Sequence, residues 1–93
     1  MSSYLMDVVV DLVPFHLMEL HYYFNHQQTV EDYTSMLSEI NFKKDFYDIC
    51  NHIMVIKMVY SNNHVKIHLW TYFEPTSVVH FQEEMKNHIM ASS

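Results

Sequence analysis

The residues whose spacing best fits metal chemistry are His80, Glu84 and His88, which recur every four residues. In a helix they would lie near one line, where imidazole and carboxylate groups can bind a transition metal. His80 and His88 would be two turns apart, about 12 Å, so only one of them could join Glu84 at an ion. A structural metal site needs four ligands. We therefore interpret the three residues as weak candidates for a metal site and expect a solvated helix surface.

Two further sets of ligand-type residues show no convergence. His16, His21 and His26 recur every five residues, and five residues turn a helix by about 140°, so their rings would diverge. Asp7 and Asp11 would lie about 13 Å apart on one face of a strand, too far to share one small ion. In a helix they would be neighbours and could form a weak cation site. We expect a solvated face or a partner contact.

Glycine and arginine are both missing from the chain. Phosphate-binding loops use glycine so that the backbone can approach the ligand, and arginine is the preferred clamp for phosphate and carboxylate groups. No serine has the glycine neighbours of a nucleophile elbow. The sequence therefore predicts a protein that is not an enzyme and binds no cofactor.

Charge is divided unevenly along the chain. Every lysine follows residue 42, so the formal net charge of −6 resides in the first 41 residues. An extended negative field attracts cationic surfaces and repels nucleic-acid phosphates. We therefore expect a basic protein partner and no nucleic acid. The carboxylates expected to contact the partner are Asp7, Asp11, Glu19, Glu31, Asp32 and Glu39.

The first element that the sequence predicts is a strand over residues 4–12. Apolar side chains alternate with polar ones, and the β-branched run Val8-Val9-Val10 favours a strand. The alternative is one helix that continues through the following segment. Pro14 ends the strand and suits the first turn of a helix.

Four helices are predicted from their starting residues and apolar periodicity. Pro14 begins the first, and Thr29, with two acids in the following turn, caps the second. Asn41 can cap the third, and Thr76 or Ser77 the last. These signals predict helices over residues 14–26, 30–39, 42–52 and 77–90.

The clearest local pattern is a hairpin. If Asn62-Asn63 forms a two-residue turn, Tyr60 pairs with Val65 and Met58 with Ile67. In the same register, Ile56 would face Leu69 and Met54 would face Thr71. All these side chains would then share one face of the hairpin.

The other face of the hairpin is expected to carry Lys57, Lys66, His68, Trp70 and Tyr72. Exposed Trp and Tyr side chains are typical anchors of protein contacts. Two lysines are too few for a nucleic-acid surface on an acidic protein. Either this face binds a partner through Trp70 and Tyr72, or another element of the fold covers it.

These elements predict one α+β domain over residues 1–93, in the order β-α-α-α-β-β-α, with disorder at residues 1–3 and 91–93. Asp7 and Asp11 interrupt the longest apolar stretch, so we expect neither a signal peptide nor a membrane span. A single cysteine, Cys50, fits a reducing compartment, and we expect a cytoplasmic protein.

Two functions are compatible with this composition. The first is a small acidic binding module, of the immunity or viral-inhibitor kind, that blocks a basic toxin or host enzyme by surface occlusion. The alternative is a structural or assembly protein of a virus or mobile element that acts as a homo-oligomer, with a homodimer as the simplest form. Eight methionines would supply adaptable contact surface for either function.

Overall fold

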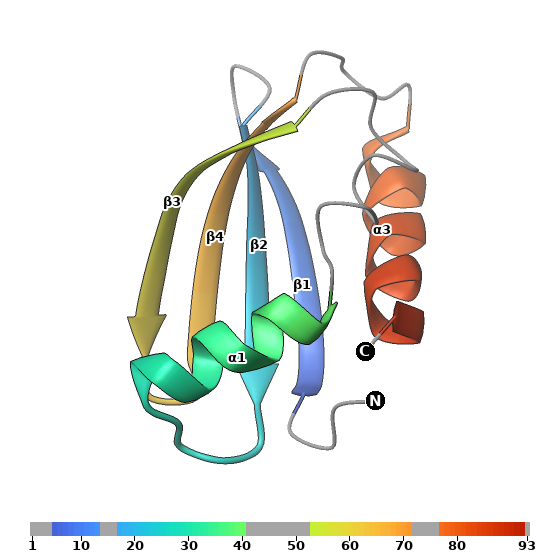
Figure 1. Ribbon diagram of the computed structural model, residues 1–93. Helices are drawn as coiled ribbons and strands as arrows, with labels where there is room; N and C mark the ends of the chain where they lie inside the picture. The colour runs from blue at the N-terminus through green and yellow to red at the C-terminus, as the bar shows by residue number, and fades with distance from the viewer. Residues whose placement is uncertain (1–4, 14–16, 41–52, 72–76, 93) are drawn as a thin grey trace.

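A computed structural model describes residues 5–13, 17–40, 53–71 and 77–92 (Figure 1). Within these residues the chain forms four strands and two helices. In chain order they are β1 (Leu5–Val13), β2 (Leu17–Phe24), α1 (Val30–Ile40), β3 (Ile53–Ser61), β4 (His64–Thr71) and α3 (Val78–Ser92). This arrangement confirms the α+β class.

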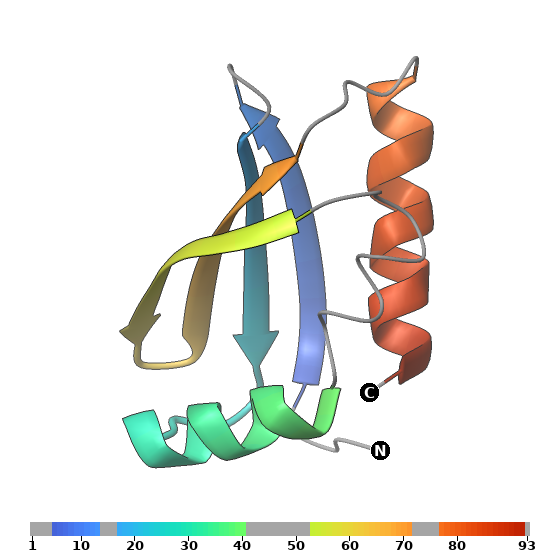
Figure 2. The ribbon, with the colours of Figure 1, turned by 45° about the horizontal axis from the view of Figure 1, so that its top comes forward.

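The four strands form one antiparallel sheet in the order β1-β2-β4-β3. Strands β1 and β2 form one pair, β3 and β4 form another, and the pairing of β2 with β4 joins them at the centre. Helix α1 crosses one end of the sheet and α3 runs beside β1 (Figures 1 and 2). Because β2 lies inside the sheet, it is hydrogen-bonded to β1 on one side and to β4 on the other.

The core lies between the two helices and one face of the sheet. Alternate residues of each strand are buried there, as the two-residue repeat of a half-covered sheet requires. Helix α1 adds Tyr33, whose ring lies 5.3 Å from that of Phe24, and α3 adds residues spaced four apart. The buried apolar residues are Val8, Val10, Met18, Leu20, Tyr22, Phe24, Tyr33, Met36, Leu37, Val65, Ile67, Leu69, Phe81, Met85 and Ile89.

The predicted helix over residues 14–26 is wrong for the part that the structure describes, because residues 17–24 form strand β2. Its leucine, methionine and glutamate favour a helix by intrinsic propensity. Pairing with a strand on each side outweighs that preference, since Met18, Leu20 and Tyr22 are then all fully buried. The order of the described elements is therefore β-β-α-β-β-α.

The other predicted helices and strands are confirmed where the structure describes them. Residues 5–13 form strand β1, so the alternative of one continuous helix through this segment is wrong. Helix α1 begins with a reciprocal cap, in which the Asp32 amide donates to Thr29 Oγ1 at 3.2 Å and the Thr29 amide to Asp32 Oδ2 at 3.3 Å. The His80 amide donates to Ser77 Oγ at 3.3 Å at the start of α3. The predicted helix over 42–52 lies outside the described residues.

The hairpin register is confirmed near its turn and wrong beyond it. Tyr60 pairs with Val65 and Met58 with Ile67, as expected. An irregularity between Val55 and Lys57 shifts the pairing by one residue, so Val55, and not Ile56, faces Leu69. Beyond it, Thr71 pairs with Ile53 rather than Met54. An extra residue in one strand is a β-bulge, which no turn signal predicts.

The last helix and the membrane prediction can also be compared with the structure. Helix α3 extends to Ser92, two residues beyond the predicted end, while residues 1–3 and 93 lie outside the described residues. Among the described segments, no helix is long and apolar enough to cross a membrane.

Candidate functional site

The side of the sheet opposite the core is the candidate for a binding surface. Both described helices pack on the core side, so in the described part of the chain neither covers this surface. Trp70, Val59 and Asp11 are exposed here. We call this surface the open face; it carries Val9, Asp11, Glu19, His21, Tyr23, Lys57, Val59, His64, Lys66, His68 and Trp70.

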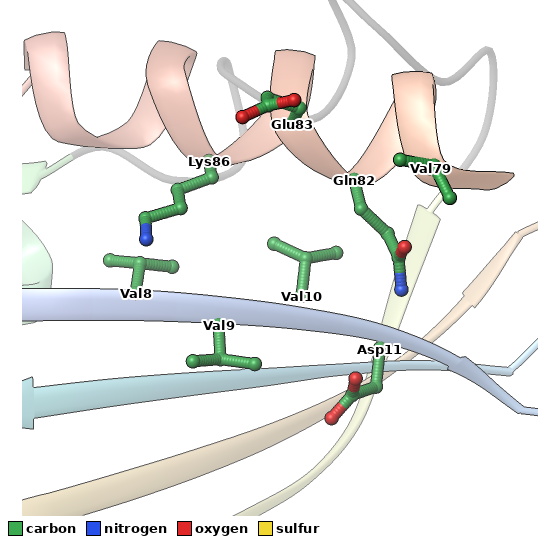
Figure 3. Close-up of a pocket in the computed structure, with 8 residues that line it drawn as sticks. All are labelled: Val8, Val9, Val10, Asp11, Val79, Gln82, Glu83 and Lys86. Carbon is green, nitrogen blue, oxygen red and sulfur yellow. The ribbon is translucent and has the colours of Figure 1, made fainter.

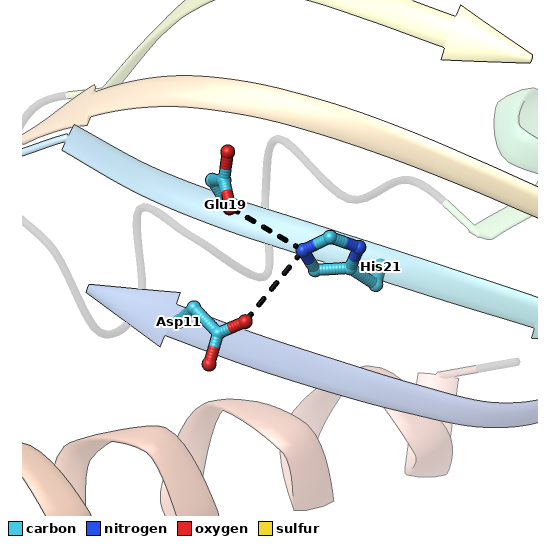
Figure 4. Close-up of side chains that lie close together, drawn as sticks. All are labelled: Asp11, Glu19 and His21. Carbon is cyan, nitrogen blue, oxygen red and sulfur yellow. Dashed lines mark ion pairs between the residues drawn. The ribbon is translucent and has the colours of Figure 1, made fainter. Parts of the chain in front are cut away.

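A cluster of carboxylates and imidazoles lies on the β1 and β2 part of the open face (Figure 4). His21 Nε2 lies 3.6 Å from Asp11 Oδ2 and 3.5 Å from Glu19 Oε1. The other oxygen of Glu19, Oε2, lies 2.8 Å from His68 Nε2. One imidazole nitrogen thus faces two carboxylates from neighbouring strands.

The second nitrogen of His21 is held by another histidine. His21 Nδ1 and His64 Nε2 are 2.9 Å apart, so one proton between them makes a hydrogen bond. The ring of His64 also stacks on that of Tyr23, with centroids 4.7 Å apart and planes 7° from parallel. These contacts fix the orientation of the His21 ring.

Electrostatics favour an ionised carboxylate and a neutral imidazole in this cluster. Desolvation raises the pKa of Glu19, but hydrogen bonds from His68 and His21 outweigh it, and the net pKa lies below the usual value. Desolvation lowers the pKa of His64, and the nearby His21 and Lys66 lower it further. Glu19 is therefore charged and His64 neutral at pH 7.

Strand β2 brings this cluster together. Its residue Glu19 pairs with Asp11 of β1 on one side and with His68 of β4 on the other. In a helix the residues of β2 could not face both neighbours. His21 is therefore excluded as a site residue only if residues 14–26 form a helix, and strand β2 overturns that assignment. The alternation of apolar residues from Met18 to Phe24 is the signal that could have identified it.

The carboxylates expected to bind a partner lie in three places. Asp11 and Glu19 lie on the open face, while Glu31 and Asp32 lie in the first turn of α1, near the turn between β3 and β4 (Figure 1). Asp7 forms an ion pair of 2.8 Å with Lys86 of α3. Glu39 lies in the last turn of α1.

The sequence also singled out two aromatic side chains, Trp70 and Tyr72, and the histidine stripe, which consists of His80, Glu84 and His88. Trp70 is exposed on the open face, and Tyr72 lies outside the described residues. On α3, His80 Nε2 and Glu84 Oε2 lie 3.7 Å apart, with both side chains largely exposed. His88 lines the same shallow pocket as this pair. Metal binding by His80, Glu84 and His88 stays a prediction.

The Asp7–Lys86 pair gives a prediction about stability. The hydrogen bond from Lys86 holds the pKa of Asp7 below its ordinary value of 3.8. A lowered pKa stabilises the fold above that value, and the contribution is lost as pH falls below it. Because both side chains are 43% exposed, Lys86→Met should lower the free energy of unfolding by only about 0.5 kcal/mol at pH 7.

Urea unfolding at pH 7 and pH 3 measures this contribution. The difference between wild type and Lys86→Met should shrink at the lower pH. Asp7→Asn is the matched control, since it removes the same pair from the other side. A difference that is equal at both pH values would contradict the assignment.

A second hollow lies between β1 and α3 (Figure 3). It has a volume of about 350 Å³, and Lys86 and Gln82 extend from the helix toward the strand while Val8 and Val10 point toward the helix. Asp11 and Val9 point to the other side of the strand. The hollow is lined by Val8, Val9, Val10, Asp11, Val79, Gln82, Glu83 and Lys86.

Comparison with known proteins finds no relative. No protein-family model matches this chain, and neither a curated protein nor a solved structure does.

Proposed function

We propose that this protein is a non-catalytic, acidic binding module that docks on a basic partner protein through its open face and inhibits that partner by occlusion. The observation that carries the proposal is the side chain of Trp70, which is 41% exposed on a sheet face that no described helix covers. A solvated tryptophan on an uncovered sheet face is typical of a contact anchor.

Charge favours a cationic partner. The chain carries a net charge of −6, which attracts basic proteins from a distance. On the open face itself, Asp11 and Glu19 lie on β1 and β2, while Lys57 and Lys66 lie on β3 and β4. A partner with its main cationic group over β1 and β2 would therefore dock in one orientation.

Occlusion is the inhibitory mechanism that this surface supports. A sheet face is a large surface with a rigid backbone, so it can cover a partner's active site without supplying reactive groups. Two lysines on an acidic protein give little attraction for phosphates, so the proposed partner is a protein and not a nucleic acid. We place this activity in the cytoplasm, where a single cysteine stays reduced.

The experiment is capture of the partner from the lysate of the producing cell at low salt. The captured protein should be basic, and rising salt should release it, because screening weakens contacts between exposed charges. Asp11→Lys should slow its association by about tenfold, since the charge reversal opposes steering. Glu84→Lys on α3 is the matched control and should have a smaller effect. An acidic partner, or release that does not depend on salt, would contradict the proposal.

Self-association is a second candidate, and the charge arrangement of the open face favours it. Two copies related by a two-fold axis along the strands would place Asp11 and Glu19 of each over Lys57 and Lys66 of the other. Sedimentation of the chain alone distinguishes the two functions. A stable dimer that Lys66→Glu disrupts supports self-association, and a monomer supports the binding module.

A further inference from the structure

The cluster around His21 suggests a property of the open face that does not depend on the proposed function. We propose that Asp11, Glu19 and His21 form a binding site for a zinc ion on the open face (Figure 4). The three residues each offer one ligand atom, and these atoms all lie within 4.8 Å of one another.

The distances within the cluster fit a tetrahedral ion. Ligand atoms bound about 2.1 Å from zinc in a tetrahedron are ~3.4 Å apart. His21 Nε2 lies 3.6 Å from Asp11 Oδ2 and 3.5 Å from Glu19 Oε1. Two of the three separations therefore match those of zinc ligands, and the third is no longer than 4.8 Å.

The nitrogen of His21 that faces the carboxylates is of the kind that binds a metal. His21 Nε2 lies toward carboxylate oxygens from both β1 and β2. Zinc binds imidazole nitrogen and carboxylate oxygen atoms together in one site.

Residues around the three ligands complete the arrangement that metal sites require. The second nitrogen of a ligating histidine is commonly hydrogen-bonded, and ligating carboxylates are hydrogen-bonded in turn. His64 holds His21 Nδ1 at 2.9 Å, and His68 holds the outer oxygen of Glu19 at 2.8 Å. His64 and His68 are therefore positioning residues, not ligands.

The ligand atoms of the site and its exposure to solvent indicate which ion it would bind. One imidazole with two carboxylates is a mixed nitrogen and oxygen set, which suits zinc better than calcium or magnesium. The side chain of Asp11 is 51% exposed, so an ion can enter from solvent and keep a water molecule at its fourth coordination position. The same position could accept a ligand atom from a bound partner.

The test is calorimetric titration of the full, untagged chain with zinc chloride at constant pH. We expect one ion per chain. His21→Gln should weaken binding by more than about 100-fold, and His64→Ala, which removes an orienting contact, by about tenfold. Asp11→Asn changes an exposed side chain and should weaken binding without loss of folding, which circular dichroism verifies.

The control is His80→Gln, which removes an exposed histidine from the stripe on α3 and should leave zinc binding unchanged. Cobalt titration gives a second readout, because tetrahedral Co²⁺ absorbs visible light strongly. Three outcomes would overturn the proposal: no stoichiometric binding, equal binding by the wild type and the folded Asp11→Asn variant, or loss of binding with His80→Gln.

Discussion

Replacing Leu20 with alanine should lower the free energy of unfolding by about 3 kcal/mol, the typical cost of removing a buried leucine side chain. Leu20 is fully buried at the centre of the sheet, where it pairs with Val10 on β1 and Ile67 on β4. Few surrounding groups can collapse into the cavity, because strands hold both sides. Urea unfolding followed by far-ultraviolet circular dichroism measures the loss.

Leu17→Ala is the matched control for this prediction. In strand β2, Leu17 and Leu20 point to opposite faces, and Leu17 is only half-buried, so its replacement should cost at most about 1 kcal/mol. In a helix the two residues, three apart, would share one face and cost similar amounts. Equal losses for the two variants would therefore contradict the strand assignment.

Trp70→Ala should weaken binding of the partner by about 30-fold, or ~2 kcal/mol, the loss typical of an anchoring tryptophan. The expected cause is the removal of a large exposed ring from the open face, with little effect on the core. Surface plasmon resonance with the captured partner measures the change, which should fall mainly on the dissociation rate.

Val79→Ala is the control for this measurement. Val79 is 72% exposed on α3, so it offers a similar exposed apolar group outside the open face. Its replacement should leave the affinity within about twofold of wild type, since isolated surface residues contribute little. Comparable losses for Val79→Ala and Trp70→Ala would show that the partner does not bind through the open face.

Local signals in the sequence predicted several elements well. The Asn62-Asn63 turn and the alternation beside it predicted the β3 and β4 hairpin. Thr29 predicted the start of α1, because a cap acts within a few residues of the helix that it begins. In each case the energy that decides the structure lies within a short stretch of chain.

Elements that depend on distant partners were harder to predict. The segment from Leu17 to Phe24 contains good helix formers, and only its pairing with β1 and β4 makes it a strand. The cluster around His21 follows from that pairing, so the sequence points to it only through the apolar alternation that marks β2 as a strand. The ion pair of Asp7 with Lys86 likewise joins residues 79 positions apart, so no local signal predicts it.

The central claim is that β2 lies between β1 and β4 and so assembles the open face. The most direct measurement is a set of nuclear Overhauser contacts from His21 in the isotopically labelled chain. We predict contacts to Val9 on one side and to Lys66 on the other, which are its cross-strand partners. Contacts from His21 only to residues three and four positions away, as in a helix, would contradict the account.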